Sequence, residues 1–190
     1  MKFRSLLTQM FAMLIACALA FNAVAAQEFM GIEVKGKLSD VTAKLKEKGF
    51  KVVNSDDAVT VFTGKVAGSE LTVAAGATPI SKQVWKIMVQ LPEKSTWSGL
   101  KDQFNEYYSI LRDKYGKPTD IYTEFINPYY DGDGYEMTAI RNDKINYFAR
   151  WDNGVWIEIS SSVAVNIHYE NLILSDLRKQ EQAKQRANVF

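Results

Sequence analysis

The spacing of apolar and polar positions predicts two helices, the first over residues 39–48. Val41 and Leu45 fall on one face of this segment, and Ser39 is a good N-cap. Gly49 follows as a stop signal. The segment therefore reads as a short amphipathic helix with one buried face.

A longer helix is expected from Ser95 or Thr96 to Tyr115, because apolar side chains recur there at steps of three and four residues. Gly116 and Pro118 end this helix. The apolar positions of this pattern, the strongest in the chain, are Trp97, Leu100, Phe104, Tyr107, Tyr108, Leu111 and Tyr115.

Extended segments follow each helix and predict strands. After the first helix they are residues 51–53, 58–62, 70–74 and 83–91. After the second helix they are residues 120–126, 135–141, 144–151, 155–160 and 163–170. Hairpin turns are expected at residues 142–143 and 152–154.

Alternation assigns the side chains of residues 83–91 to two faces of the predicted strand. One face is expected to hold Trp85, Ile87, Val89 and Leu91. The other face is expected to hold Lys86, Met88 and Gln90.

The order of elements, a helix and then strands twice over, predicts an α+β fold. One domain over residues 27–170 is expected, with two halves, 36–92 and 95–170, that each combine a helix with antiparallel sheet. The helices would pack on one face of the sheet. Residues 171–190 are polar and are expected to form a C-terminal helix or a frayed tail.

The first 26 residues have the pattern of a cleavable signal peptide. Lys2 and Arg4 form a short basic start, and an apolar stretch follows over residues 6–20. Cleavage after Ala25 or Ala26 would satisfy the preference for small residues at such sites. The working protein is therefore expected to begin near residue 27 and to be periplasmic or secreted.

Cys17 offers an alternative anchor. Residues 14–17, Leu-Ile-Ala-Cys, resemble the lipobox of bacterial lipoproteins, in which the cysteine is lipidated. The apolar residues after Cys17 favour ordinary cleavage over lipid anchoring. Cys17 is the chain's single cysteine, so no disulfide is expected within the mature chain.

Charge argues against a nucleic-acid partner. The chain has 23 basic and 22 acidic residues, and removal of the leader takes two basic residues and no acidic one, which leaves a net charge of −1. A near-neutral chain without a basic stripe is poorly suited to phosphate backbones. No stretch after the leader is long and apolar enough to predict a membrane-spanning helix.

Several motifs resemble those of small exported proteins of unknown function from gut Gram-negative anaerobes. These motifs are the helix end at 45–50, the hairpin at 61–68 and the pattern from Trp97 to Pro118. The repeated order of helix and strands is also similar to that of the beta-lactamase inhibitory protein fold and of small outer-membrane assembly lipoproteins. These resemblances concern structure and imply no particular chemistry.

Catalytic motifs are missing from the sequence. The mature chain has one histidine, His168, and no cysteine, and it lacks a nucleophile elbow, a phosphate-binding loop and a dinucleotide fingerprint. His168 is expected in the last strand, where a lone histidine is usually an ordinary hydrogen-bonded residue. No catalytic residue and no cofactor are predicted.

A loop at residues 127–136 carries the candidate metal ligands Asp131, Asp133 and Glu136. Their oxygen atoms suit calcium. The EF-hand pattern fails because Tyr135 stands where a third oxygen ligand belongs. Asp-Gly repeats are also common in loops between strands, so an ordinary loop is the alternative.

The most distinctive candidate site is a mixed aromatic and charged face of the second half. Alternation assigns Trp156 of one strand and Phe148 and Arg150 of the preceding strand to the face opposite the aliphatic one. His168 and Glu170 join them if the strands align. Such a composition is typical of a protein-binding patch. The alternative is that the C-terminal helix or a neighbouring copy covers these aromatic side chains.

The sequence therefore favours an exported, non-catalytic binding module that recognises another envelope or extracellular protein. A second hypothesis is a carrier of a small molecule or glycan that stacks on Tyr129, Tyr130 and Trp156. A third is a hydrolase without recognisable motifs.

Overall fold

The structure, a computed structural model, describes residues 27–187. The predicted leader at 1–26, with Cys17, lies outside the described residues. Across residues 27–187, none of the helices combines the length and the apolar character that a bilayer crossing requires.

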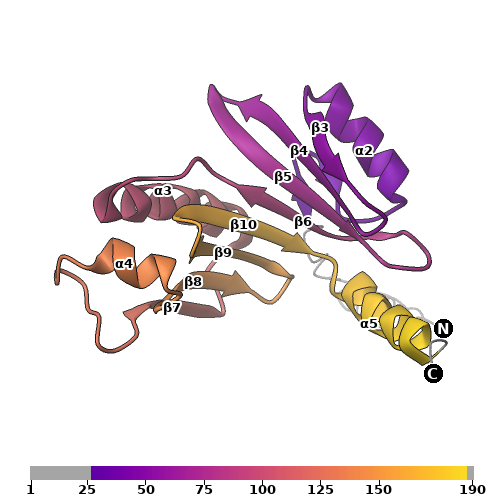
Figure 1. Cartoon of the computed structure of the whole chain (residues 1–190). Helices are drawn as coiled ribbons and strands as arrows, with labels where there is room; N and C mark the ends of the chain where they lie inside the picture. The colour runs from indigo at the N-terminus through magenta and orange to yellow at the C-terminus, as the bar shows by residue number, and fades with distance from the viewer. Residues whose placement is uncertain (1–26, 188–190) are drawn as a thin grey trace, which may run out of the picture.

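One antiparallel sheet of eight strands organises the fold, in the order β3-β4-β5-β6-β10-β9-β8-β7 (Figure 1). Across the sheet the strands are β3 (Lys51–Ser55), β4 (Val59–Val66), β5 (Ser69–Ala77), β6 (Val84–Gln90), β10 (Ala164–Glu170), β9 (Val155–Ser160), β8 (Ile145–Trp151) and β7 (Asp120–Phe125). A separate two-stranded sheet near the start of the chain consists of β1 (Glu28–Phe29) and β2 (Ile32–Glu33). With the helices, this confirms the predicted α+β fold.

Two helices cover one face of the large sheet. They are α2 (Leu38–Glu47) and α3 (Trp97–Tyr115), the two helices expected from the spacing of apolar residues. Thr96 caps α3 by accepting a hydrogen bond from the Gly99 backbone N–H at 3.1 Å. Because their apolar stripes face the strands, α2 and α3 seal the hydrophobic core between helices and sheet.

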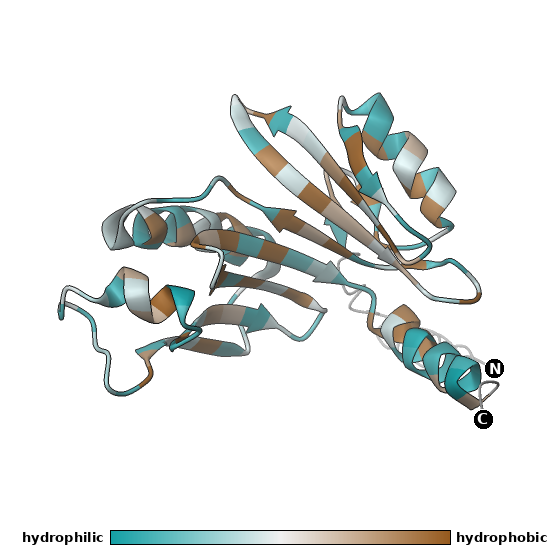
Figure 2. Cartoon of the chain, viewed as in Figure 1, coloured by the Kyte–Doolittle hydropathy of each residue, from teal (hydrophilic) through white to brown (hydrophobic). Residues whose placement is uncertain are grey.

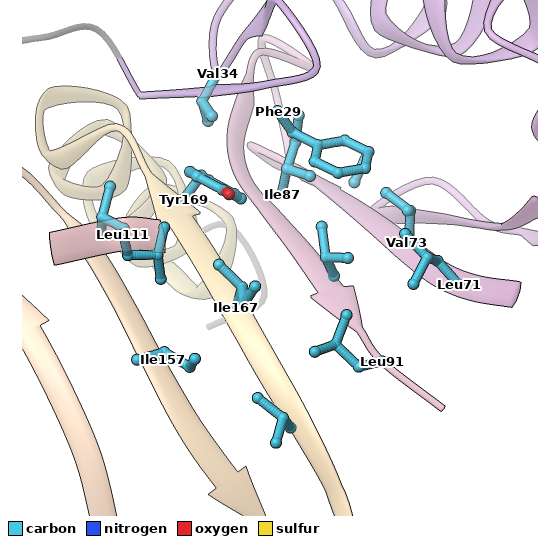
Figure 3. Close-up of a cluster of buried hydrophobic side chains, with 14 of the residues drawn as sticks. Phe29, Val34, Leu71, Val73, Ile87, Leu91, Leu111, Ile157, Ile167 and Tyr169 are labelled. Atoms are coloured by element: carbon cyan, nitrogen blue, oxygen red, sulfur yellow. The ribbon is translucent and has the colours of Figure 1, made fainter. Parts of the chain in front are cut away.

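Aliphatic and aromatic side chains form the core face of the sheet, and Figure 2 shows apolar and polar residues alternating along the strands. Figure 3 shows side chains from neighbouring strands gathered into one cluster with Leu111 of α3. Cross-strand pairing sets one row of this cluster, which runs Phe62, Val73, Val89, Ile167, Ile157 and Ala149. The core is therefore continuous across both halves of the chain.

The two halves of the sheet repeat one order of elements. Helix α2 precedes β3 to β6, and helix α3 precedes β7 to β10, with the short helix α4 (Glu136–Arg141) between β7 and β8. At the centre, β6 pairs antiparallel with β10, and Met88 lies opposite His168. Each of these is the fifth residue of a seven-residue strand. The halves thus meet along one strand pair related by an approximate two-fold.

The strand predicted at residues 135–141 is wrong, because this segment forms α4. Ala139 and Ile140 are adjacent in sequence and both are fully buried. A strand would send such neighbours to opposite faces, whereas a helix can bury both. The turn expected at 142–143 accordingly ends a helix and does not join two strands.

The predicted face of Trp85 is also wrong. The pairing of β5 with β6 shifts between Gly76, which pairs with Lys86, and Ala77, which pairs with Val84. This shift leaves Trp85 as the extra residue of a bulge. A Cβ placed on Gly76 would lie 3.2 Å from Trp85 Nε1, so Trp85 shares the face of Gly76 and Lys86. Ile87, Val89 and Leu91 are buried on the core face, as predicted.

Of the two alternatives for the C-terminal segment, the structure has a helix, α5 (Leu172–Ala187). It lies on the side of the sheet away from α2 (Figure 1). The guanidinium of Arg178 lies 4.1 Å from the centre of the Trp85 ring. A Glu181 side-chain oxygen accepts hydrogen bonds from the backbone N–H groups of Ile80 at 2.7 Å and Ser81 at 3.1 Å. These contacts join α5 to β6 and to the loop between β5 and β6.

Truncation of Ile157 tests the shared core. Ile157→Ala should lower the free energy of unfolding by about 2–5 kcal/mol, because a fully buried side chain leaves a cavity. Urea unfolding of residues 27–190 would measure the change. The control is Ile110→Ala, whose side chain on α3 is 54% exposed and should cost less than about 0.5 kcal/mol. Equal effects of the two substitutions would contradict the assignment of the core.

The attachment of α5 depends on Glu181. Glu181→Ala should destabilise the protein by about 1–3 kcal/mol, because two backbone N–H groups lose their shared acceptor. Faster hydrogen exchange at the Ile80 and Ser81 amides is the specific readout. Asp176→Ala removes an exposed carboxylate from the same helix and should leave both amides unchanged.

Candidate functional site

The open face of the sheet brings together all five side chains that alternation selected. Trp156 pairs directly with Arg150 of β8 and with His168 of β10. Phe148 lies one row away on β8, and Glu170 lies one row away on β10. The antiparallel register places these side chains on the face opposite α2 and α3, which we call the open face.

Trp156 is stacked against His168 at the centre of the open face. The ring centroids lie 4.3 Å apart and the planes differ by 7°. His168 Nε2 lies 2.9 Å from a carboxylate oxygen of Glu158, and His168 is only 4% exposed. The stack and the hydrogen bond together hold the indole ring in one orientation.

Burial lowers the pKa of His168 below its usual value, and it outweighs the opposing effect of the hydrogen bond to Glu158. The histidine is therefore neutral at pH 7, with Nε2–H donating to Glu158. Its Nδ1 atom has no hydrogen-bond partner among residues 27–187. Because His168 is neutral, Glu158 keeps its negative charge unneutralised by the ring.

Lys86 reaches Trp156 from β6. Its Nζ atom lies 4.3 Å from the centre of the Trp156 ring, within the range of a cation–π contact. Burial lowers the pKa of Lys86, while the carboxylates of Glu170 and Glu158 act in the opposite direction. The indole thus already holds one cation supplied by the protein itself.

A shallow cavity of about 500 Å³ borders Trp156. Its lining comes from β8, β9, the turn between them, the last residue of β10 and the start of α5: Phe148, Arg150, Trp151, Asp152, Gly154, Trp156, Glu158, Glu170 and Leu172. His168 and Lys86 do not line it. The indole is therefore shared between its contacts with these two side chains and the cavity.

Arg150 and Phe148 extend the site toward the edge strand β7. The Arg150 guanidinium donates to one oxygen of Asp120, with Nη2 at 2.7 Å and Nε at 3.2 Å. The Phe148 ring lies 5.1 Å from that of Tyr122, which is 47% exposed. An aromatic band thus runs from the edge of the sheet to Trp156.

Helix α5 covers only part of the open face. Arg178 lies over Trp85, and Leu172 borders the cavity. Trp156 and Phe148 are left half-buried. The sequence suggested that either the C-terminal helix or a neighbouring copy could cover these aromatic side chains. The C-terminal helix reaches only the rim of the aromatic patch and leaves its centre open.

Of the candidate metal ligands, Asp131 and Asp133 lie on the loop between β7 and α4 and Glu136 is the first residue of α4, away from the open face. Asp131 accepts hydrogen bonds from Trp97 Nε1 at 2.6 Å and from Lys101, and these contacts hold its pKa below the usual range. Asp133 accepts from the backbone N–H groups of Tyr130 and Tyr135, and Glu136 accepts from that of Gly132. No cluster of three or more potential metal-ligating side chains occurs between residues 27 and 187.

Sequence reasoning left two members of the site out. Glu158 is two residues after Trp156 in β9, so the alternation of side chains along a strand is enough to place it on the open face. No local sequence pattern indicates that Lys86 lies near Trp156, because this proximity depends on the pairing of β6 with β10. Strand order is a tertiary property that alternation cannot supply.

Titration of His168 tests the description of the stack. It is the chain's single histidine, so its ring signals in an NMR titration are unambiguous. The midpoint should fall below the ordinary value of about 6.5, and Trp156→Ala should raise it by exposing the ring. An ordinary midpoint in the unmodified protein would contradict the burial of His168.

The lowered pKa of His168 also predicts how the free energy of unfolding depends on pH. The unfolded chain binds the histidine proton at a higher pH than the folded chain, so acidification below about pH 6.5 favours unfolding. The free energy of unfolding should fall by up to about 1.4 kcal/mol per pH unit until the folded-state pKa is passed. His168→Gln should remove this component from the measured profile.

Comparison of the chain with protein-family models, curated proteins and solved structures found no match.

Proposed function

We propose that this chain is an exported, non-catalytic module that binds another protein of the cell envelope or the extracellular space through its open face. One observation carries the proposal. Trp156 is half-buried and is braced by His168 and Lys86 beside a cavity that α2, α3 and α5 leave open.

The composition of the open face supports protein recognition. Tryptophan, tyrosine and arginine supply most of the residues that dominate binding energy at protein interfaces. Here Tyr122, Phe148, Arg150 and Trp156 lie on adjacent strands. A broad polar rim around a few aromatic anchors is the usual arrangement of a non-obligate interface.

Rigidity also favours binding. A side chain that is already held in its bound rotamer loses little conformational entropy when a partner docks. Trp156 is fixed on one side by the parallel imidazole of His168, which Glu158 holds in turn. Part of the ring lines the cavity, where a partner can contact it.

Neither nitrogen of His168 is suited to act as a general base. Nε2 is committed to Glu158, and Nδ1 is buried. A general base must come within hydrogen-bond reach of the proton that it removes. This geometry supports a structural role for the histidine within a binding surface.

A small-molecule or glycan carrier is the second candidate, and the size of the cavity favours it. A volume of about 500 Å³ falls within the range of ligand pockets, and a tryptophan ring is a good stacking platform. Tyr129 and Tyr130, which the carrier hypothesis included, lie on the loop between β7 and α4 and do not line the cavity. Only Trp156 of that trio remains available for this function.

Affinity capture with matched variants tests the proposed function. Tagged residues 27–190 would be incubated with solubilised envelope proteins of the native cell, and captured proteins would be quantified by mass spectrometry. A partner held by the unmodified protein should be reduced about 30-fold or more by Trp156→Ala, the effect of losing a hot spot worth about 2 kcal/mol.

Ile110→Ala is the matched control, because it removes an exposed apolar side chain from α3 on the covered side of the sheet. It should leave capture unchanged. Arg150→Ala, on the open face and outside the core, should weaken capture in the same direction as Trp156→Ala. A partner captured equally by all three variants would place the interface elsewhere and contradict the proposal.

A further inference from the structure

The charges around the cavity beside Trp156 are unbalanced. Its lining carries three carboxylates, on Asp152, Glu158 and Glu170, and one guanidinium, on Arg150. Arg150 is already paired with Asp120, so it does not neutralise the lining. The carboxylates of this cavity therefore outnumber the cations left to offset them.

Lys86 of β6 is a cation close to these carboxylates, and it offsets only one of their charges. Its ammonium interacts with both Glu170 and Glu158. His168 adds no charge at pH 7, because it is buried and neutral. Arg178 of α5 is a second cation that acts on Lys86 and lies nearby. After Lys86 and Arg178 are both counted against the three carboxylates, an excess of one negative charge remains at the cavity.

The aromatic surfaces of the site suit a cation as well. The electron-rich face of an indole attracts ammonium and guanidinium groups. Among the described residues, the open face contains three intramolecular examples of this contact: Lys86 on Trp156, Lys86 on Trp85 and Arg178 on Trp85. Phe148 and Leu172 line the same cavity and can pack against an aliphatic stem.

From this complementarity we infer that the cavity receives a basic side chain of the partner protein, with arginine preferred over lysine. The inference rests on the protein-binding function proposed above. An arginine side chain in this cavity would place its planar guanidinium against the Trp156 ring and direct its N–H groups to Glu158 and Glu170. Lysine presents a compact point charge and lacks this planar fork, so it fits less well.

A peptide probe tests the inference on residues 27–190. The probe is N-acetyl-Gly-Arg-Gly-amide, and its neutral twin carries citrulline, which keeps the shape of the side chain but lacks the positive charge. Binding is followed through the indole N–H signal of Trp156 in NMR spectra, assigned with Trp156→Phe. The arginine peptide should shift this signal with a Kd in the millimolar range, the lysine peptide should bind more weakly, and the citrulline peptide should produce no saturable shift.

Isosteric variants locate the effect. Glu158→Gln with Glu170→Gln should weaken the arginine peptide by about tenfold, because both charge-assisted hydrogen bonds lose their ionised acceptor. The matched control is Glu47→Gln with Glu106→Gln, which changes net charge equally at exposed positions on α2 and α3. This control should leave the Kd unchanged. Equal binding of the arginine and citrulline peptides, or equal weakening by both double variants, would overturn the inference.

The outcomes separate the inference from the function on which it rests. A partner that is lost with Trp156→Ala but is bound equally by the Glu158→Gln, Glu170→Gln double variant would preserve protein binding and overturn the basic anchor. Arginine-selective binding without any captured partner would support the cation site and count against the protein-binding function. A Trp156 shift with maltose but not with the arginine peptide would overturn the inference and favour the carrier.

Discussion

The pairing of β6 with β10 is the constraint on which the rest of the structure depends. It joins two helix-and-strand halves into one sheet, so that neither half has to bury its apolar face alone. The register of this pair also decides what meets at the centre of the open face. With Met88 opposite His168 and Lys86 opposite Glu170, the ammonium of β6 is brought within reach of the indole on β9.

The two faces of this sheet have different roles. On the core face, aliphatic and aromatic side chains pack under α2 and α3, and burial of apolar surface is the main stabilising contribution. On the open face, the chain places charged and aromatic side chains that hold one another by stacking, cation–π contacts and hydrogen bonds. The core face therefore gives the sheet its rigidity, and the open face uses that rigidity to fix the positions of its side chains.

The stack at Trp156 carries a cost that is informative about its role. His168 is buried with Nδ1 unpaired among the described residues, and an unsatisfied buried acceptor typically costs about 1–3 kcal/mol. The His168 ring, which is hydrogen-bonded to Glu158, orients the indole of Trp156 beside the cavity. Polar groups that are retained at such a cost are expected where recognition, and not stability alone, shapes the surface.

The fold class, both helices of the core and all eight strands of the large sheet, apart from their exact ends, could be predicted from the sequence, because periodicities of 3.6 and 2 are local properties. The same alternation was sufficient to place Trp156, Phe148 and Arg150 on one face. It failed for residues 135–141, where burial of both Ala139 and Ile140 selects a helix. It failed again at Trp85, where a bulge against Gly76 reverses the side-chain direction. Only the tertiary structure decided which strands are neighbours, since pairing between distant segments leaves no local pattern. That order brings Lys86 to Trp156, leaves the cavity beside it open, and sets the charges that surround it.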